Sequence, residues 1–178
     1  MVNKKLFLSV ICLIICTIGT NAQTHRYVGA FKCKMCHNTP SMGQQYKIWS
    51  ESVHAKALSS LSSDKSKEYA KNNNIADPAK EPKCLKCHST VASIDKSLIA
   101  TITPDEAISC ESCHGPGSDY NTNSIMKDKA TAIKNGLIIS DEQVCLKCHN
   151  PESPFYQPFD FAKAKEQIAH PIPPPPKQ

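Results

Sequence analysis

The feature that most constrains this chain is a Cys-x-x-Cys-His string that occurs four times. Its cysteine pairs are Cys33 and Cys36, Cys84 and Cys87, Cys110 and Cys113, and Cys145 and Cys148. The histidines that follow directly are His37, His88, His114 and His149. Two thiols on one helical turn can form thioethers with the two vinyl groups of a haem, and the next imidazole then takes an axial position on the iron. The motifs therefore predict four covalently attached c-type haems.

Two other uses of paired cysteines explain this pattern less well. A structural zinc ion needs two Cys-x-x-Cys pairs that converge on one metal, and it does not require a histidine after each pair. Disulfides are common in exported proteins rich in cysteine, but they give no role to four histidines in the same position. Haem attachment is the interpretation that uses every residue of the motif. Outside the four motifs the chain has only Cys12 and Cys16.

The N-terminal segment has the pattern of a secretory signal peptide. A basic start at Met1–Lys5 precedes a fourteen-residue apolar run, Leu6–Gly19. Small residues, Thr20 and Ala22, stand before the expected cleavage at Gln23. Since a bilayer-spanning helix needs about 20 residues, an uncleaved membrane anchor is the weaker alternative. We therefore expect the protein to be exported to the periplasm.

The remaining chain has the size of a single domain. We expect a signal peptide over residues 1–22, a haem domain over residues 23–170, and a loosely held, extended proline-rich tail over residues 171–178. With 6% aromatic residues and a mean hydropathy of −0.37, the polypeptide has few apolar side chains for a core of its own. The expected fold class is therefore mostly α, with little or no sheet and with the chain wrapped around its haems.

Capping residues and apolar periodicity predict several helices. They are expected at residues 41–61, 103–114, 125–134 and 159–170, and a capping box at residues 140–143 leads into the fourth motif. The 103–114 helix carries the third motif and stops at Gly115. Residues 62–83 are polar and interrupted by proline, and residues 91–103 are β-branched enough for a short strand or hairpin.

Four haem irons have up to four distal positions, and the chain has few histidines to fill them. Outside the motifs lie only His25, His54 and His170, so at least one iron takes methionine, another group, or nothing. His54 and His170 are predicted iron ligands. His25 is close to the mature N-terminus, where disorder is common. Met126, on the helix after the third motif, is a candidate ligand, with a packing role as an equal alternative.

Two longer strings resemble a known family. The run from Cys33 to Leu58, with Trp49 and the sequence His-Ala-Lys-Ala from His54, is similar to the start of the tetrahaem cytochrome c-554 family. The string CESCHGPG from Cys110 and the order of the four motifs extend the resemblance over nearly all of the mature chain.

This resemblance implies a set of distal ligands. His54 would serve the third haem and His170 the fourth, while the second haem would be five-coordinate. The family's first haem takes a distal histidine ten residues beyond the third motif, where this chain has Ser124. Met126 is then the natural substitute at the first haem.

Closely spaced haems and the resemblance both favour electron transfer between redox partner proteins. One alternative is an enzyme that reduces nitric oxide, nitrite or hydroxylamine at an open second haem. Another is a subunit of a larger membrane-associated redox complex, with the proline tail as a docking segment. The net charge of +5 includes two lysines of the signal segment, and no basic run contains interleaved aromatic residues. Nucleic acid is therefore not an expected partner.

Overall fold

The computed structural model describes residues 24–174, and their regular structure is helical. Within this range the α-helices are α1 (Ala30–His37), α2 (Gln45–Glu51), α3 (Ala57–Ser60), α4 (Asp64–Asn72), α5 (Pro82–His88), α6 (Thr90–Ser93), α7 (Cys110–His114), α8 (Asn123–Met126), α9 (Lys129–Lys134), α10 (Glu142–Leu146) and α11 (Phe161–Ile168). Short 3-10 turns are η1 (Pro40–Met42), η2 (Lys96–Leu98), η3 (Pro104–Glu106) and η4 (Gly117–Asp119). The expected signal peptide and the last residues of the tail lie outside the described residues.

The expected fold class, mostly α with little or no sheet, is confirmed. In the described part of the chain, extended pairing is limited to one isolated parallel bridge between Tyr27 and Ile99. The strand or hairpin expected at residues 91–103 is wrong. That segment forms the end of α6 and η2, because Ser89 and Asp95 cap these two turns by accepting hydrogen bonds from the backbone N–H groups of Ala92 and Ser97.

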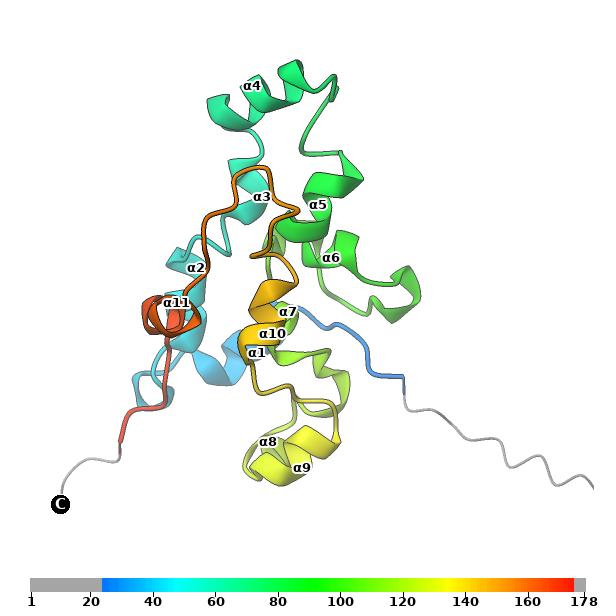
Figure 1. Cartoon of the computed structure of the whole chain (residues 1–178). Helices are drawn as coiled ribbons and strands as arrows, with labels where there is room; N and C mark the ends of the chain where they lie inside the picture. Colours follow the sequence, from blue (N-terminus) through cyan, green and yellow to red (C-terminus); the bar gives the residue numbers. More distant parts are fainter. Residues whose placement is uncertain (1–23, 175–178) are drawn as a thin grey trace, which may run out of the picture.

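The helices that carry the motifs lie toward the middle of the molecule (Figure 1). In this view α1, α7 and α10 are central, α4 forms one end, and α8 and α9 form the opposite end. Contacts join α1 to α2 and α7, and α5 to α3 and α6. Helices far apart in the sequence therefore meet around the motifs.

Several expected helices are interrupted. The helix expected at residues 41–61 is wrong as a continuous element, because Gly43 (φ 88°) and Gln44 (φ 51°) are left-handed and the chain becomes extended at Ser52. What forms instead is η1, α2 and α3. The interruption places His54 in the turn between α2 and α3.

Local caps divide two other expected helices. The 103–114 helix begins with the expected capping box of Thr103 and Glu106, but Ala107 has φ 52° and the third motif occupies a separate helix, α7. Asp128 accepts a hydrogen bond from the backbone N–H of Thr131 and starts α9, so residues 125–134 contain the end of α8 and the whole of α9. The polar segment 62–83 contains α4, which Ser63 caps.

The apolar core of the described chain is small. Its buried apolar residues are Val28, Ala30, Leu61, Ala70, Ile102, Ala107, Tyr120 and Ala132, of which four are alanines. The largest side chains with almost no exposed surface are polar: Glu111, Thr90 and Ser109. A chain that buries so little apolar surface needs another source of stability, as the composition predicts.

Candidate haem-binding site

Each motif occupies a helical turn with a defined start. The first lies on α1, the second on α5 and the third on α7, while the fourth begins in α10 and ends in the turn after it. Glu81 and Pro82 start α5, and Asp141 starts α10 by accepting a hydrogen bond from the backbone N–H of Val144. Gly115 (φ 77°) ends α7 directly after His114. Each motif thus forms a helical turn, which places its two thiols and its imidazole on the same side of that turn.

The motifs are brought together in an order that differs from their order in the sequence. The Cys33 thiol of the first motif lies close enough to Cys110 of the third for the two to shift each other's pKa. Cys113 of the third motif lies close enough to Cys145 of the fourth for a charge interaction. Cys87 of the second motif lies close enough to Cys148 of the fourth to contribute, after burial, to the raised pKa of Cys148. In space the motifs therefore run first, third, fourth, second.

Two motif histidines each face a histidine from elsewhere in the chain. The rings of His54 and His149 have centroids 6.1 Å apart and planes at 86°. The rings of His114 and His170 have centroids 6.0 Å apart and planes at 85°. Two ring nitrogens at about 2 Å from one metal ion place the ring centroids roughly 6 Å apart. Both pairs thus have the spacing of axial ligands on opposite sides of one iron.

The facing rings differ in part from the assignment implied by the family resemblance. The His170 ring faces His114 of the third motif, not the fourth. The His54 ring faces His149 of the fourth motif, but His54 also lines a cavity with Cys110, Cys113 and His114 of the third. The backbone carbonyl of His54 accepts a hydrogen bond from Ile108 N–H, and the Trp49 indole donates to the Ile108 carbonyl at 2.8 Å. These contacts fix the turn that presents His54. That each of the two histidines binds iron stays a prediction.

Hydrogen bonds orient several of these imidazoles. The Nδ1 atom of His88 lies 2.7 Å from the Ala57 carbonyl oxygen. The Nδ1 atom of His170 lies 2.8 Å from the Ile168 carbonyl oxygen, and that of His114 lies 3.3 Å from the Ile138 carbonyl oxygen. A carbonyl oxygen only accepts, so Nδ1 donates and Nε2 is left free to bind a metal. Burial is the main cause of a lowered pKa for both His54 and His114. The neutral ring that iron binds is therefore favoured.

One large cavity joins the first and third motifs. It has a volume of about 610 Å³, within the range of cofactor pockets. Its lining includes Cys33, His37, Cys110, Cys113, His114, His170 and Met126. The Gln45 Oε1 atom also lines it and is buried without a hydrogen-bond partner. A cavity that is mainly apolar, edged by thiols and imidazoles and holding an unpaired polar atom, fits the chemistry of haem. Met126 shares this cavity with His37.

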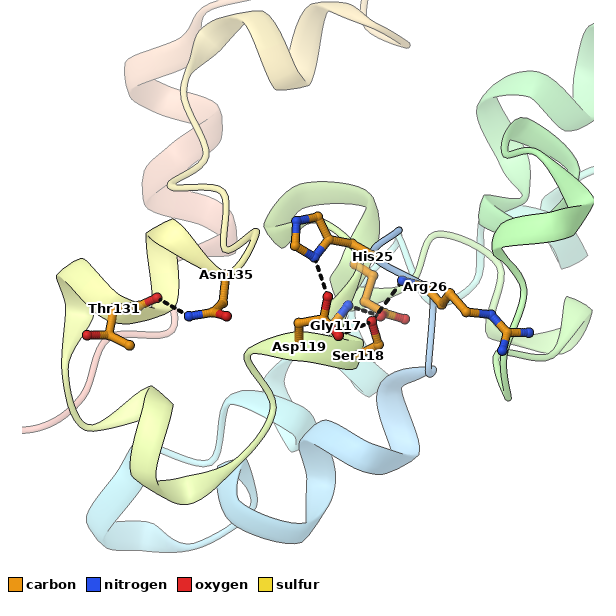
Figure 2. Close-up of polar contacts among 8 residues, drawn as sticks. His25, Arg26, Gly117, Ser118, Asp119, Thr131 and Asn135 are labelled. Carbon is orange, nitrogen blue, oxygen red and sulfur yellow. Dashed lines mark hydrogen bonds and ion pairs between the residues drawn. The ribbon is translucent and has the colours of Figure 1, made fainter. Parts of the chain in front are cut away.

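His25 is engaged away from that cavity. Its Nδ1 atom lies 2.6 Å from Asp119 Oδ2, as Figure 2 shows, and the imidazole packs against Gly136. The neighbouring backbone N–H of Arg26 donates to Ser118 Oγ at 2.8 Å. His25 therefore fastens the N-terminal segment to the loop after the third motif.

Two carboxylates to which the sequence analysis gave no role at the site hold the first and third motifs together. Glu111 accepts hydrogen bonds from the backbone N–H groups of Val28, Gly29 and Gly117 at 2.6–2.9 Å. Glu106 accepts from Ala30 N–H at 2.6 Å. Glu111 stands between the cysteines of the third motif, so its position marks it as near the site. Its burial, however, depends on a distant segment.

The described residues show no other obvious metal site. Across residues 24–174, no three His, Cys, Asp or Glu side chains converge as ligands of a bare metal ion would. None of the eight motif cysteines, all within that range, forms a disulfide. In the same range, none of the helices is both long enough and apolar enough to cross a bilayer.

Comparisons with known proteins agree with this picture. The family model for cytochrome c554 and c-prime matches residues 32–115. Cytochrome c-554 of Nitrosomonas europaea is 30% identical over an alignment of 142 positions, which covers 69% of this chain and 57% of that protein. The chain therefore spans a little over half of that relative's length.

A solved structure is similar as well. The reduced state of cytochrome c554 from Nitrosomonas europaea aligns with a TM-score of 0.51 at 23% identity, over 82% of this chain and 79% of that chain. At this identity the likeness supports the fold. The repeated haem-attachment motif on a sheet-free fold defines a multihaem c-type cytochrome. Within that class, the chain matches the cytochrome c554 family.

Proposed function

We propose that this protein is an exported, periplasmic electron carrier with four covalently attached haems. The observation that carries the proposal is the proximity of the four motifs, through Cys33 with Cys110, Cys113 with Cys145, and Cys87 with Cys148. Each haem, when bound, supplies an iron that alternates between ferric and ferrous. Side chains in contact between neighbouring motifs support a continuous route from the first motif to the second, with redox proteins as donor and acceptor.

The chain's own residues then hold and tune the haems. The motif cysteines provide the covalent attachment, and His37, His88, His114 and His149 are the proposed proximal ligands. His54 is proposed as the partner of His149, and His170 as the partner of His114, on the basis of their facing rings. Met126 is the proposed partner of His37, because both line one cavity.

The test is to express the whole chain in a host that attaches c-type haems. Intact-protein mass and iron content should correspond to four haems on a chain that begins at Gln23. A reductive titration should then give several reversible one-electron steps. A protein with fewer than four haems, or one whose haems cannot be reduced and reoxidised reversibly, would contradict the proposal.

A second candidate function is reduction of a small nitrogen compound at the second haem. The observation that favours it is that the histidines outside the motifs already lie beside other groups. Two of the three outside the motifs lie beside other motif histidines, and His25 is paired with Asp119, so none remains for His88. An iron held by His88 alone has an open side for nitric oxide, nitrite or hydroxylamine.

Electron paramagnetic resonance separates the two functions. Spectra of the ferric protein, recorded with and without nitric oxide, should contain one high-spin signal that responds to the ligand if the second haem is open. Steady turnover of the compound by the reduced protein would then establish an enzyme. Ligand binding without turnover would leave the electron carrier as the function.

A further inference from the structure

The outer face of α1 is an exposed apolar surface. Phe31 is 68% exposed and Met35 is 72% exposed. With Lys34, Asn38 and Thr39 they line a shallow depression. We call these five residues the α1 outer face.

This face is turned away from the side on which α1 attaches its haem. Phe31, Met35 and Asn38 recur at i, i+4 and i+7, so they share one side of the helix. Cys33, Cys36 and His37 recur at i, i+3 and i+4 and share the other side. Haem held by the first motif therefore does not cover Phe31 and Met35. A single helix separates the two surfaces.

The first motif is also the one nearest to solvent. Cys36 is exposed, whereas the other seven motif cysteines are half-buried. A partner bound on the α1 outer face would thus approach an accessible edge of the first motif. By contrast, the carboxylates close to α1, Glu106 and Glu111, accept backbone hydrogen bonds from its N-terminal side and are not exposed on this face.

The chain segment that forms the face carries one sign of charge. From His25 to Ser50 the sequence contains Arg26, Lys32, Lys34 and Lys47 and no aspartate or glutamate. The Lys34 ammonium lies 6.0 Å from the centroid of the Phe31 ring and 5.1 Å from that of the Tyr46 ring. These aromatic contacts hold a positive charge directly beside the apolar centre.

From this arrangement we propose that the α1 outer face is the docking site for a redox protein whose own surface has an apolar centre within an acidic rim. The inference rests on the proposed electron-carrier function. The apolar centre supplies binding, and the lysines steer the encounter. In the docked complex, the reduced partner gives one electron to the ferric iron of the first motif, which becomes ferrous as the partner is oxidised.

The test uses reduced flavodoxin, a small acidic redox protein, as the probe. Stopped-flow absorbance measures the second-order rate of reduction of the haem-loaded protein over a range of salt concentrations. The test variant is Lys32→Glu with Lys34→Glu. The matched control is Lys67→Glu with Lys71→Glu, which makes the same charge change on the exposed surface of α4, away from α1.

The α1 variant should be reduced at least about tenfold more slowly at low salt, and the difference should close as salt increases, because screening removes steering. The α4 variant should change by less than about twofold. As a readout independent of electron transfer, carbodiimide should cross-link Lys32 or Lys34 to flavodoxin carboxylates. Equal slowing of both variants, or cross-links mainly at α4, would overturn the proposal.

A third variant tests the apolar centre. Phe31→Ser should weaken flavodoxin binding severalfold while leaving the salt dependence of the rate unchanged. If sedimentation shows that the wild-type protein self-associates and that Phe31→Ser abolishes this, the face belongs to a second copy of the chain and the proposal is wrong. Dithionite should reduce every variant fully. Loss of haem or of that reduction would instead count against the electron-carrier function.

Discussion

At the scale of single residues, Glu111 connects the first and third motifs through one carboxylate. Its side chain is 1% exposed and accepts three backbone hydrogen bonds. Burial is the main reason that its pKa is raised above the ordinary 4.5, although the three hydrogen bonds act in the opposite direction. The folded protein therefore holds this proton more tightly than the unfolded chain does.

The sign of this pKa shift gives a prediction for Glu111→Gln. The contribution of Glu111 to the free energy of unfolding is fully present below pH 4.5 and declines as pH rises through the raised pKa of the folded state. Glutamine resembles the protonated acid in being neutral, but its NH₂ group replaces one oxygen and cannot accept a hydrogen bond from the backbone N–H that faces it. We expect the variant to be less stable by about 1–3 kcal/mol at pH 4.5, with a smaller deficit at neutral pH.

Denaturant unfolding of the haem-loaded protein at several pH values measures this deficit. Glu68→Gln, on the exposed surface of α4, is the control and should leave stability unchanged to within about 0.5 kcal/mol. A deficit that grows toward neutral pH would show that the ionised form of Glu111 is the stabilising one.

Met126 offers a second prediction at this scale. A methionine ligand raises the potential of a haem relative to a bis-histidine haem. Met126→Leu keeps the side-chain volume but removes the sulfur, so one redox step should move to lower potential and one more iron should become high-spin. Met42→Leu is the matched control. Redox titration and electron paramagnetic resonance measure both effects. Unchanged spectra would mean that Met126 packs against other side chains and does not bind iron.

At the scale of elements, α7 depends on the glycine that ends it. Gly115 has φ 77°, and a Cβ atom there would lie 2.7 Å from the Gly136 carbonyl oxygen and 3.0 Å from the Ile138 side chain. The backbone of Ile138 is hydrogen-bonded to His114 through its N–H. The end of α7 and the orientation of its histidine are thus fixed by the same close approach.

Gly115→Ala should therefore destabilise the protein by about 2–4 kcal/mol, because it combines left-handed strain with a clash against backbone. It should also alter the spectrum of the haem at the third motif. Asn74→Ala is the control, since Asn74 has φ 55° but is exposed, and it should cost only about 1 kcal/mol. Thermal unfolding followed at a haem band measures both, and equal losses would rule out the clash.

The elements also show which features of the fold could be predicted from sequence. Local signals worked where they act within one turn: the motifs, the Thr103 capping box and the stop at Gly115. Long apolar periodicity failed at residues 41–61, because left-handed Gly43 and Gln44 interrupt it. Pro171 and Pro173 of the expected loose tail lie against Gly43, a contact that no local pattern encodes.

The same distinction holds for the candidate site: features set by local sequence could be predicted, and features set by long-range packing could not. Motif spacing identifies the cysteines and proximal histidines, since both lie within five consecutive residues. Which motif His54 and His170 approach depends on how α11 and the turn after α2 pack. The family resemblance pairs His170 with the fourth motif, whereas its ring faces His114 of the third, and His54 lies near both motifs. The burial of Glu111 was not predictable either, because the N–H groups that Val28 and Gly29 donate to it come from more than 80 residues away.

At the scale of the whole molecule, we expect the stability of the fold to depend on bound haem. The few buried apolar side chains are mostly small, whereas several large ones, such as Ile139 at 52% and Ile172 at 62%, are exposed around the cavity of the first and third motifs. Bound haem would cover such residues and supply apolar surface that the chain lacks.

We therefore expect the haem-free chain to be largely unfolded. Protein expressed without the machinery for haem attachment, and kept reduced, should have a small fraction of the helical circular dichroism of the haem-loaded protein and no cooperative thermal transition. The loaded protein from the same sequence is the control. Full helix content in the haem-free chain would mean that the polypeptide folds on its own contacts.

The spatial order of the motifs also has a consequence for how the protein is made. The first motif is synthesised earliest, yet Cys110, which lies near Cys33, follows 77 positions later. Likewise Cys148, which lies near Cys87, follows it by 61 positions. Each early motif thus remains without its neighbour while the intervening chain is synthesised. Haem attachment that began in this interval would therefore act on open polypeptide, and closure of the structure would be delayed until nearly the whole chain had been made.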